Sequence, residues 1–163
     1  LIHNNRAGAM DADIVYYLRA QGLSDEEIQR GMTKDGGLKG ISGVSSDLRY
    51  VLEAAETGNE RAKLAVDVYV TGIVRYIAAF AAELGGLDCL AFTGGIGENS
   101  DVIRKMVCGR LEQMGVRLST RRNTKERGDR RISKKRSRVR VYVIAANEEL
   151  GVARKTYGCE KNA

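Results

Sequence analysis

The chain has 163 residues, of which 43% are apolar and 29% are charged, and its net charge is +6. This length and apolar content predict one folded domain with a core of its own and exclude two large domains. The most apolar stretch is interrupted by Asp67, Arg75 and Glu83, so we expect no membrane span of about 18 unbroken apolar residues.

The chain begins Leu-Ile-His-Asn-Asn-Arg, without an initiator methionine and without the apolar core of a secretory signal. We therefore expect it to start inside a longer protein. One histidine, His3, and three scattered cysteines, Cys89, Cys108 and Cys159, predict neither a zinc site nor a disulfide framework. The expected location is the reducing cytoplasm.

No proline interrupts the chain, so glycines mark the boundaries of the predicted elements. The apolar spacing over 11–21 predicts a helix, and the capping box from Ser24 to Glu27 opens a short helix that ends near Gly31. A further helix is expected after Ser45 or Ser46, with a turn at residues 57–59. These elements make the first part of the chain helical.

A long core helix is predicted from Glu60 to about Leu84, and Gly85-Gly86 ends it. Its apolar positions step by three or four and trace one continuous stripe. The stripe consists of Val66, Val70, Ile73, Ile77, Phe80 and Leu84.

The second part of the chain alternates between short apolar runs and helical periods. Residues 87–93 predict a buried strand, 100–114 a helix, 139–144 a second strand, and Asn147 opens a last helix. The order favours an α/β fold with parallel strands between helices. Two strands are few for a sheet, so we expect the sheet to be incomplete.

Residues 117–140 connect the predicted helix to the second strand and contain twelve lysines and arginines against Glu126 and Asp129, a net of +10. The remaining chain has 15 basic and 19 acidic residues, a net of −4. The stretch has no apolar period and no aromatic side chain for base stacking. We interpret it as a solvated loop; a nucleic-acid-binding surface is the alternative.

The segment Phe92-Thr-Gly-Gly-Ile-Gly-Glu-Asn-Ser100 joins a predicted strand to a helix start. Glycines there permit left-handed angles and close approach of a ligand, and the amides of a helix start favour an anion. A nucleotide fits this pattern, although the spacing is neither a dinucleotide-binding fingerprint nor a phosphate-binding loop with its lysine. A tight turn without a ligand is the alternative.

Three further segments carry weaker signals. Gly43-Val-Ser-Ser-Asp-Leu-Arg49 crowds polar residues at a helix start, which capping alone also favours. Asn147-Glu-Glu-Leu150 suits either the helix dipole or a hard cation such as Mg²⁺. Arg6, followed by Ala-Gly-Ala-Met-Asp11, is either a phosphate clamp or an ordinary surface arginine.

Taken in this order, the four motifs resemble the acetate kinase family, within the acetate and sugar kinase/Hsc70/actin superfamily. The longer segment Gly40-Ile-Ser-Gly-Val-Ser-Ser-Asp-Leu-Arg49 and Gly85-Gly-Leu-Asp88 also look like segments of that family. The resemblance implies the C-terminal part of an actin-like (ribonuclease H-like) ATPase domain over residues 1–163, with an incomplete sheet flanked by helices. The chain looks like the last two fifths of a family member.

The resemblance implies reversible transfer of the γ-phosphoryl group of ATP to acetate or another short-chain carboxylate, giving an acyl phosphate and ADP. It places Arg6 against the transferring phosphoryl group. It makes Glu148 the ligand of Mg²⁺ or Mn²⁺. The residues implied to hold ATP or ADP are Asp47, Leu48, Arg49, Gly95, Ile96, Gly97, Glu98 and Asn99. The full-length enzyme is expected to be a homodimer.

The sequence also departs from the family, because Ala9 stands where the family has an acidic residue. The family's catalytic histidine and phosphate loop are missing, and His3 does not align with that histidine. We therefore expect no turnover by this chain alone. The alternatives are an adenine-nucleotide-binding module without chemistry, a basic nucleic-acid-binding protein, and a propionate or butyrate kinase. Neither a membrane nor a nucleic acid is an expected partner.

Overall fold

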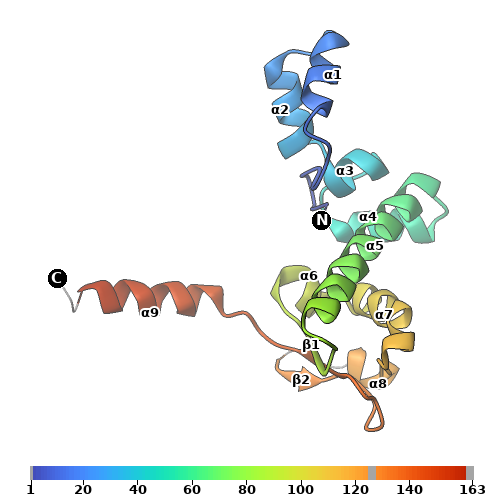
Figure 1. The fold of residues 1–163 in the computed structure, drawn as a ribbon, viewed down its shortest axis with the longest axis vertical. Coiled ribbons are helices and arrows are strands. Elements are labelled where there is room, and N and C mark those ends of the chain that lie inside the picture. The colour runs from blue at the N-terminus through green and yellow to red at the C-terminus, as the bar shows by residue number, and fades with distance from the viewer. Residues whose placement is uncertain (1, 125–127, 161–163) are drawn as a thin grey trace. The chain divides into compact units, whose positions relative to one another are not determined.

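The structure is a computed structural model that describes residues 2–124 and 128–160. Packing divides the chain after Gly86 into two compact units (Figure 1). The N-terminal unit is helical, and the C-terminal unit contains the sheet. The expectation that the whole chain acts as one nucleotide-binding part stays a prediction.

The N-terminal unit begins with α1 (Ile14–Ala20) and α2 (Asp25–Thr33). The predicted capping box at the start of α2 is confirmed: the Ser24 hydroxyl accepts from the Glu27 amide at 3.3 Å, and the Glu27 carboxylate accepts from the Ser24 amide at 2.8 Å. These two bonds satisfy donors that a helix start otherwise leaves unpaired. They fix where the turn ends and α2 begins.

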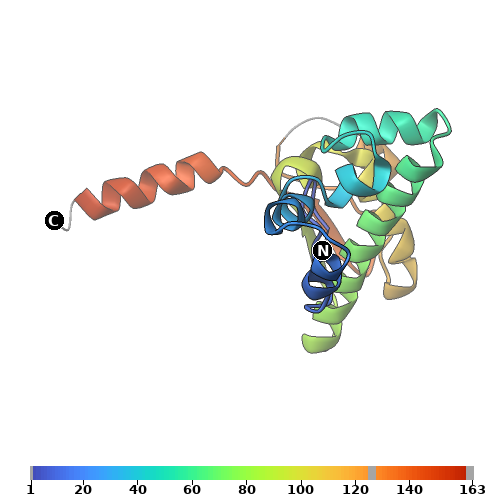
Figure 2. The same ribbon diagram turned by 90° about the horizontal axis from the view of Figure 1, so that it is seen from above.

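Three more helices complete this unit: α3 (Gly37–Ser42), α4 (Leu48–Glu56) and α5 (Glu60–Glu83). Both α3 and α4 pack against α5, which is one unbroken helix in both views (Figures 1 and 2). The core of the unit is apolar, with fully buried side chains at Leu38, Val51, Ala65 and Val70. The sequence predicted α4 and α5 but not α3, which has glycines at two of its six positions.

The apolar stripe of α5 is buried only in its first half. Val66 and Val70 are buried, whereas Phe80 is 56% exposed and Leu84 is 78% exposed. The expectation of a core helix along its whole length is therefore wrong for the end of the stripe, although Ala81 in the last turn is buried. Apolar periodicity shows which side chains share a face, but it does not show how far the neighbouring helices extend along that face.

By length and composition alone, α5 could cross a membrane, and it is the only helix within residues 2–124 and 128–160 that could. The charged residues in it do not prevent this, so our expectation from unbroken apolar runs was too strict. Core helices commonly pass the same test, and six residues of α5 are buried. The length of α5 is thus weak evidence for a span.

The C-terminal unit contains a small mixed sheet with the strand order β1-β3-β2. Its strands are β1 (Cys89–Phe92), β2 (Arg130–Arg131) and β3 (Arg140–Val143). The predicted parallel pairing of β1 and β3 is confirmed, with Cys89 opposite Arg140 and Phe92 opposite Val143. The antiparallel β2 was not predicted, and β1 is less buried than expected because only Phe92 is fully covered.

The sequence predicted two of the helices in this unit, those after residue 100 and after Asn147, but not the three short ones. In chain order the helices are α6 (Gly94–Asn99), α7 (Asp101–Arg110), η1 (Glu112–Met114), α8 (Thr120–Asn123) and α9 (Glu148–Glu160). The predicted helix after residue 100 ends at Arg110 rather than near Met114; its inward positions Ile103 and Val107 are buried, as is Leu111 just after it, whereas Met114 is half-buried. All described side chains from residue 148 to residue 157 are exposed.

The basic stretch 117–140 is not the solvated loop that we expected. It contains α8 and β2, and several of its side chains point into the core: Asn123, Ile132, Ser133, Ser137 and Val139 are buried. Apolar and small residues alternate with cations in this stretch. The loop interpretation counted the charges but not this alternation. Lys125, Glu126 and Arg127 lie outside the described residues.

Two cysteines of this unit have free thiols in different surroundings. Cys89 is exposed on β1, and Cys108 is buried on α7, where burial raises the pKa of its thiol to about 12. A thiol with so high a pKa carries almost no thiolate at neutral pH and is therefore unreactive. The side chain of Cys159 lies outside the described residues.

Candidate functional site

Arg6 lies on a segment that docks onto the start of α3. The carbonyls of His3 and Asn4 accept hydrogen bonds from the amides of Leu38 and Lys39 at 2.9 and 3.0 Å. These amides belong to the first turn of α3, where no intrahelical acceptor exists. The segment thus holds Arg6 in place through backbone bonds alone.

The side chain of Arg6 is exposed, and it forms no ion pair with any residue that the structure describes. A cavity of about 430 Å³ adjoins it. The other lining residues are His3, Ala7, Gly8, Met10, Met32 and Thr33. A free guanidinium at the edge of a cavity suits an anionic group, because its donors remain available for bidentate hydrogen bonds.

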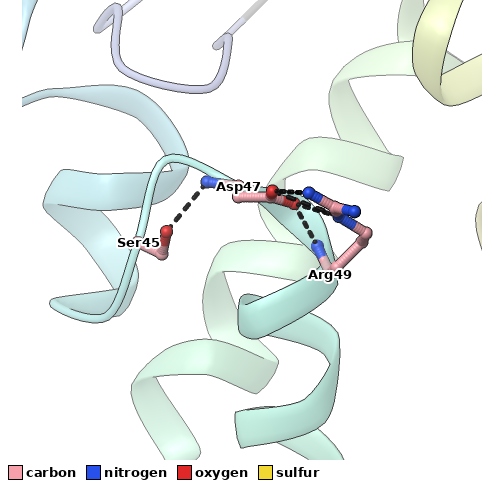
Figure 3. A network of polar contacts seen from close by, with 3 residues as sticks. All are labelled: Ser45, Asp47 and Arg49. Carbon is pink, nitrogen blue, oxygen red and sulfur yellow. Dashed lines mark hydrogen bonds and ion pairs between the residues drawn. The ribbon is translucent and has the colours of Figure 1, made fainter.

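Asp47 and Arg49 form one hydrogen-bonded unit at the start of α4 (Figure 3). The Asp47 carboxylate accepts from the Arg49 amide at 2.9 Å and from the Arg49 guanidinium through both Nε and Nη2. Asp47 is therefore the N-cap of α4, and our expectation of Ser45 or Ser46 was wrong. Ser45 acts one step earlier, because its hydroxyl accepts from the Asp47 amide at 3.0 Å.

The hydrogen bonds from Arg49 lower the pKa of Asp47 to about 2, from an ordinary value of 3.8. A depressed pKa means that the carboxylate stabilises the folded state above the unfolded pKa, and that this contribution disappears as the pH falls from 3.8 through 2. We expect Arg49→Gln to raise the Asp47 pKa toward 3.8. Carbon-detected NMR titration of the carboxyl group measures this directly.

The matched control for that titration is Arg30→Gln, which removes an exposed arginine from another carboxylate of the same unit, Asp35. It should leave the Asp47 curve unchanged. An Asp47 pKa that stays near 2 in Arg49→Gln would show that the cap alone, and not the guanidinium, sets the titration.

Leu48 differs from its two neighbours because its side chain is only 6% exposed and belongs to the core of the unit. Arg49, by contrast, has 85% of its side chain exposed. A ligand at this helix start would therefore meet the Leu48 backbone and the Arg49 side chain.

The glycine-rich segment is a short helix, α6, and not the open turn that we expected. Of its three glycines only Gly94 has a positive φ, +73°, so only this position requires the freedom of glycine. A Cβ atom at Gly94 or Gly95 would meet no atom within 4 Å, whereas at Gly97 it would lie 3.3 Å from the backbone of Phe92. The first two glycines leave open space, and the third lets α6 pack closely on β1.

Glu98 connects the start of α6 with the chain that follows β3. One carboxylate oxygen, Oε1, accepts from the Gly94 amide at 2.8 Å and from the Ala146 amide at 3.0 Å. The Gly94 amide is therefore occupied by a protein carboxylate, and the expectation that amides of this segment favour an anion stays a prediction. Glu98 holds α6 beside the segment that leads to Glu148.

Asn99 closes α6 from its other end, because its side-chain amide donates to the Gly95 carbonyl at 2.8 Å. Glu98 and Asn99 also adjoin a cavity of about 360 Å³ in the C-terminal unit. Its remaining lining residues are Gly128, Arg130, Val143 and Ala145. The end of α6 and the end of β3 thus border one hollow.

Arg104 is a central residue of this site that sequence reasoning missed. Its side chain is 2% exposed, and its guanidinium donates at 2.8 Å to the carbonyls of Gly97 and Glu98, and to the side-chain and backbone oxygens of Asn123. Asn123 in turn donates to the Asp101 carbonyl at 2.8 Å. Arg104 therefore fixes the last turn of α6 on α7 and α8.

Burial lowers the pKa of Arg104, and the nearby positive charge of Arg130 lowers it further. The group still remains charged, because the ordinary arginine pKa is far above neutral pH. A charged donor is suited to several carbonyls at once. The only sequence signal was an arginine between the buried positions Ile103 and Val107.

Glu148 is the first residue of α9 and has an exposed side chain. Asn147 before it has φ +46°, a left-handed angle that asparagine tolerates better than most residues. The described parts of the chain contain no cluster of three histidine, cysteine or acidic side chains that could hold a metal. The adjacent Glu149 is also exposed, so the start of α9 presents two neighbouring carboxylates.

The predicted site residues are divided between the two units. The N-terminal unit carries Arg6 and the pair Asp47 and Arg49, and the C-terminal unit carries α6 and Glu148. Within the second unit, Glu98 brings α6 next to Ala146, two residues before Glu148. Residues 48 positions apart in sequence are thus joined by a single carboxylate oxygen.

Comparison with known proteins identifies the family. A sequence profile described as the acetokinase family matches residues 1–154. An acetate kinase of Syntrophomonas wolfei is 41% identical over 162 residues, which are 99% of this chain and 41% of that relative. This chain therefore spans about two fifths of the relative's length.

Two solved structures agree with this match. The crystal structure of acetate kinase from Porphyromonas gingivalis has a TM-score of 0.87 and 41% identity, covering 97% of this chain and 40% of that one. A propionate kinase from Francisella tularensis has a TM-score of 0.83 and 35% identity, covering 92% and 38%. The expected actin-like ATPase fold with an incomplete sheet is confirmed, and the chain belongs to the acetokinase family, of which it covers the C-terminal part.

Proposed function

We propose that this chain is the C-terminal, nucleotide-binding part of an acetate-kinase-type enzyme. The reaction is reversible transfer of the γ-phosphoryl group of ATP to acetate, giving acetyl phosphate and ADP. Similarity to acetate kinases over 99% of the chain supports this proposal. Propionate and butyrate are the alternative substrates, and the similarity to a propionate kinase supports propionate among them.

The observation that carries the nucleotide role is the open backbone at the start of α6. A Cβ at Gly94 or Gly95 would meet no atom within 4 Å, so a flat ligand can approach the peptide groups there. Close approach to backbone is the purpose that glycine serves in many nucleotide sites. We assign Gly95, Ile96, Gly97, Glu98 and Asn99 to nucleotide binding, with Gly97 and Glu98 acting through the shape of α6.

The second nucleotide-contacting segment in our proposal is the start of α4. Asp47 holds the Arg49 guanidinium through two of its nitrogens, which leaves one exposed planar face free for stacking. A planar cation stacks favourably on an aromatic ring such as adenine. Leu48 would contribute its peptide group, because its side chain lies in the core.

Arg6 is the residue that we propose for the phosphoryl group in transfer. Its guanidinium is exposed beside a cavity. Phosphoryl transfer depends on positioning and on charge stabilisation at the equatorial oxygens, which a guanidinium supplies with bidentate hydrogen bonds. The docked backbone around Arg6 would keep this donor oriented.

Glu148 is the proposed ligand for Mg²⁺ or Mn²⁺. Mg²⁺ is commonly held by one or two carboxylates together with substrate phosphates and water. The exposed Glu148 carboxylate at the start of α9 fits that pattern as one part of the ligand set. When bound, the metal ion neutralises charge on the phosphates.

The chain on its own is expected to bind the nucleotide without turning it over, because it spans only about two fifths of its relatives. A non-catalytic adenine-nucleotide-binding module is therefore the second candidate function. The full-length enzyme is proposed to be a cytoplasmic homodimer.

The test is a calorimetric titration of the purified chain with MgADP. Gly95→Val should weaken binding by about tenfold or more, because the added side chain fills the space above an exposed backbone. Gly109→Val is the matched control: Gly109 is also an exposed helical glycine with nothing within 4 Å of a Cβ. It carries the same helix-propensity cost but lies outside the proposed site.

Equal weakening by Gly95→Val and Gly109→Val would contradict the proposed nucleotide site. Acetyl phosphate formation by the purified chain would contradict the expectation that it lacks turnover. Gly97→Val is a poorer probe, because its side chain would press on the Phe92 backbone and disturb the fold as well as the site.

A further inference from the structure

The basic stretch forms an ordered cationic surface in the C-terminal unit. Five exposed cations lie on two adjoining backbone segments and are called here the cationic ridge. The ridge consists of Arg117, Lys134, Lys135, Arg136 and Arg138.

Backbone hydrogen bonds join the two segments of the cationic ridge. The Lys134 amide donates to the Arg117 carbonyl at 2.8 Å, and the Arg117 amide donates to the Ser137 hydroxyl at 2.9 Å. The Val139 amide donates to the Gly115 carbonyl at 3.2 Å. The cations are thus carried by a fixed scaffold.

The end of the ridge continues into β3 with a regular alternation of exposure. Arg136, Arg138 and Arg140 are exposed, while the residues between them, Ser137 and Val139, are buried. The Arg138 guanidinium donates to the Met114 carbonyl at 2.8 Å and so lies against the backbone, whereas no such bond to a described residue holds the exposed side chains of Arg136 and Arg140.

The positive charge of the ridge is almost uncompensated. Glu112 approaches Arg117 at 3.7 Å, and it is the only carboxylate among residues 2–124 and 128–160 that forms an ion pair with the ridge. Asp129, the nearest acidic residue in sequence, is engaged elsewhere, because its carboxylate accepts from the Ala145 amide. Cations on a scaffold without counter-charges attract an anionic partner.

We infer that the cationic ridge binds the phosphate backbone of double-stranded nucleic acid without sequence preference. Residues 115–140 contain no aromatic side chain, so bases of a single strand would find nothing to stack on. Phosphate contacts need only lysine and arginine donors, which the ridge supplies. A double strand, whose bases are already stacked, is the partner that this chemistry fits.

An acidic protein surface fits less well than a nucleic acid. Protein interfaces obtain most of their affinity from buried aromatic and apolar anchors. No large apolar side chain is exposed among the described residues between 115 and 140. The ridge offers charge without such anchors, and this inference is independent of the proposed kinase function.

Fluorescence anisotropy with labelled DNA and RNA duplexes of about 24 base pairs tests the proposal as salt is varied. Five phosphate contacts predict that log K falls against log[salt] with a slope of about −4.5. The variant Lys134→Gln, Lys135→Gln, Arg136→Gln should make the slope shallower by about 2.7 and weaken binding by about tenfold or more.

The control is Lys34→Gln, Lys63→Gln, Lys105→Gln, which removes three exposed lysines and the same net charge from elsewhere on the chain. It should leave the slope unchanged. Binding of either duplex that is lost only in the ridge variant supports the proposal and shows which nucleic acid is preferred. Equal losses of affinity in the ridge variant and the control would overturn it. So would tighter binding of a single strand of the same sequence than of the duplex, or polyglutamate that competes for the chain as well as unlabelled duplex does.

Discussion

Replacing Arg104 by methionine is expected to lower the free energy of unfolding of the C-terminal unit by about 3 kcal/mol. Methionine fills much of the same space but cannot donate. The change leaves the carbonyls of Gly97 and Glu98 and two oxygens of Asn123 without the donor that satisfied them. Buried acceptors that lose their partner are costly, so the loss exceeds that of an ordinary surface contact. The chain has no tryptophan, so this loss of stability is measured by urea unfolding followed by far-ultraviolet circular dichroism.

Lys105→Met is the matched control, because Lys105 is the exposed neighbour of Arg104 on α7. It should change the stability by less than about 0.5 kcal/mol. Arg104→Lys should fall between the two, since an ammonium group keeps the charge but cannot reach all four acceptors. A loss for Arg104→Met as small as that for Lys105→Met would mean that water replaces the guanidinium without cost.

The elements that could be predicted from the sequence are those that depend on neighbours within one or two turns. The long period of α5 and the capping box at Ser24 are both local, and both are confirmed. Local geometry and side-chain chemistry suffice for such features.

The missed elements depend on contacts between distant parts of the chain. β2 is two residues long and exists only because Arg130 and Arg131 pair with β3. α3 begins at Gly37, and the next two amides, those of Leu38 and Lys39, donate to carbonyls of the segment before Arg6. No periodicity marks either element, since a strand of two residues and a helix of six are too short to show one.

The candidate site shows the same limit. The sequence could identify the glycine-rich segment, but not that Glu98 occupies the Gly94 amide and reaches Ala146. It could place Arg104 on α7, but not show that Asn123, 19 residues away, completes its hydrogen bonds. Both side chains shape α6 from within the protein. The sequence pattern predicts which residues lie near the site, whereas the packing shows which of them hold the backbone of α6 in position.

Replacing Gly37 by alanine is expected to destabilise the N-terminal unit by about 4 kcal/mol. Gly37 has φ +60°, and a Cβ there would lie 1.9 Å from the His3 carbonyl oxygen and 2.7 Å from that of Arg6. Both are backbone atoms, so the clash cannot be relieved by a side-chain rotation. The segment that carries Arg6 must move away, and the amides of Leu38 and Lys39 lose their acceptors. Hydrogen exchange of these two amides and urea unfolding measure the two effects.

Gly85→Ala separates the steric effect from backbone strain. Gly85 has a similar φ of +72°, but nothing lies within 4 Å of a Cβ there, so the substitution should cost only about 1 to 2 kcal/mol. The difference between the two variants is then the cost of displacing the docked segment, because the strain term is common to both. If Gly37→Ala and Gly85→Ala are equally destabilising and the Leu38 amide stays protected, the segment before α3 yields freely, and docking of that segment does not hold Arg6 in place.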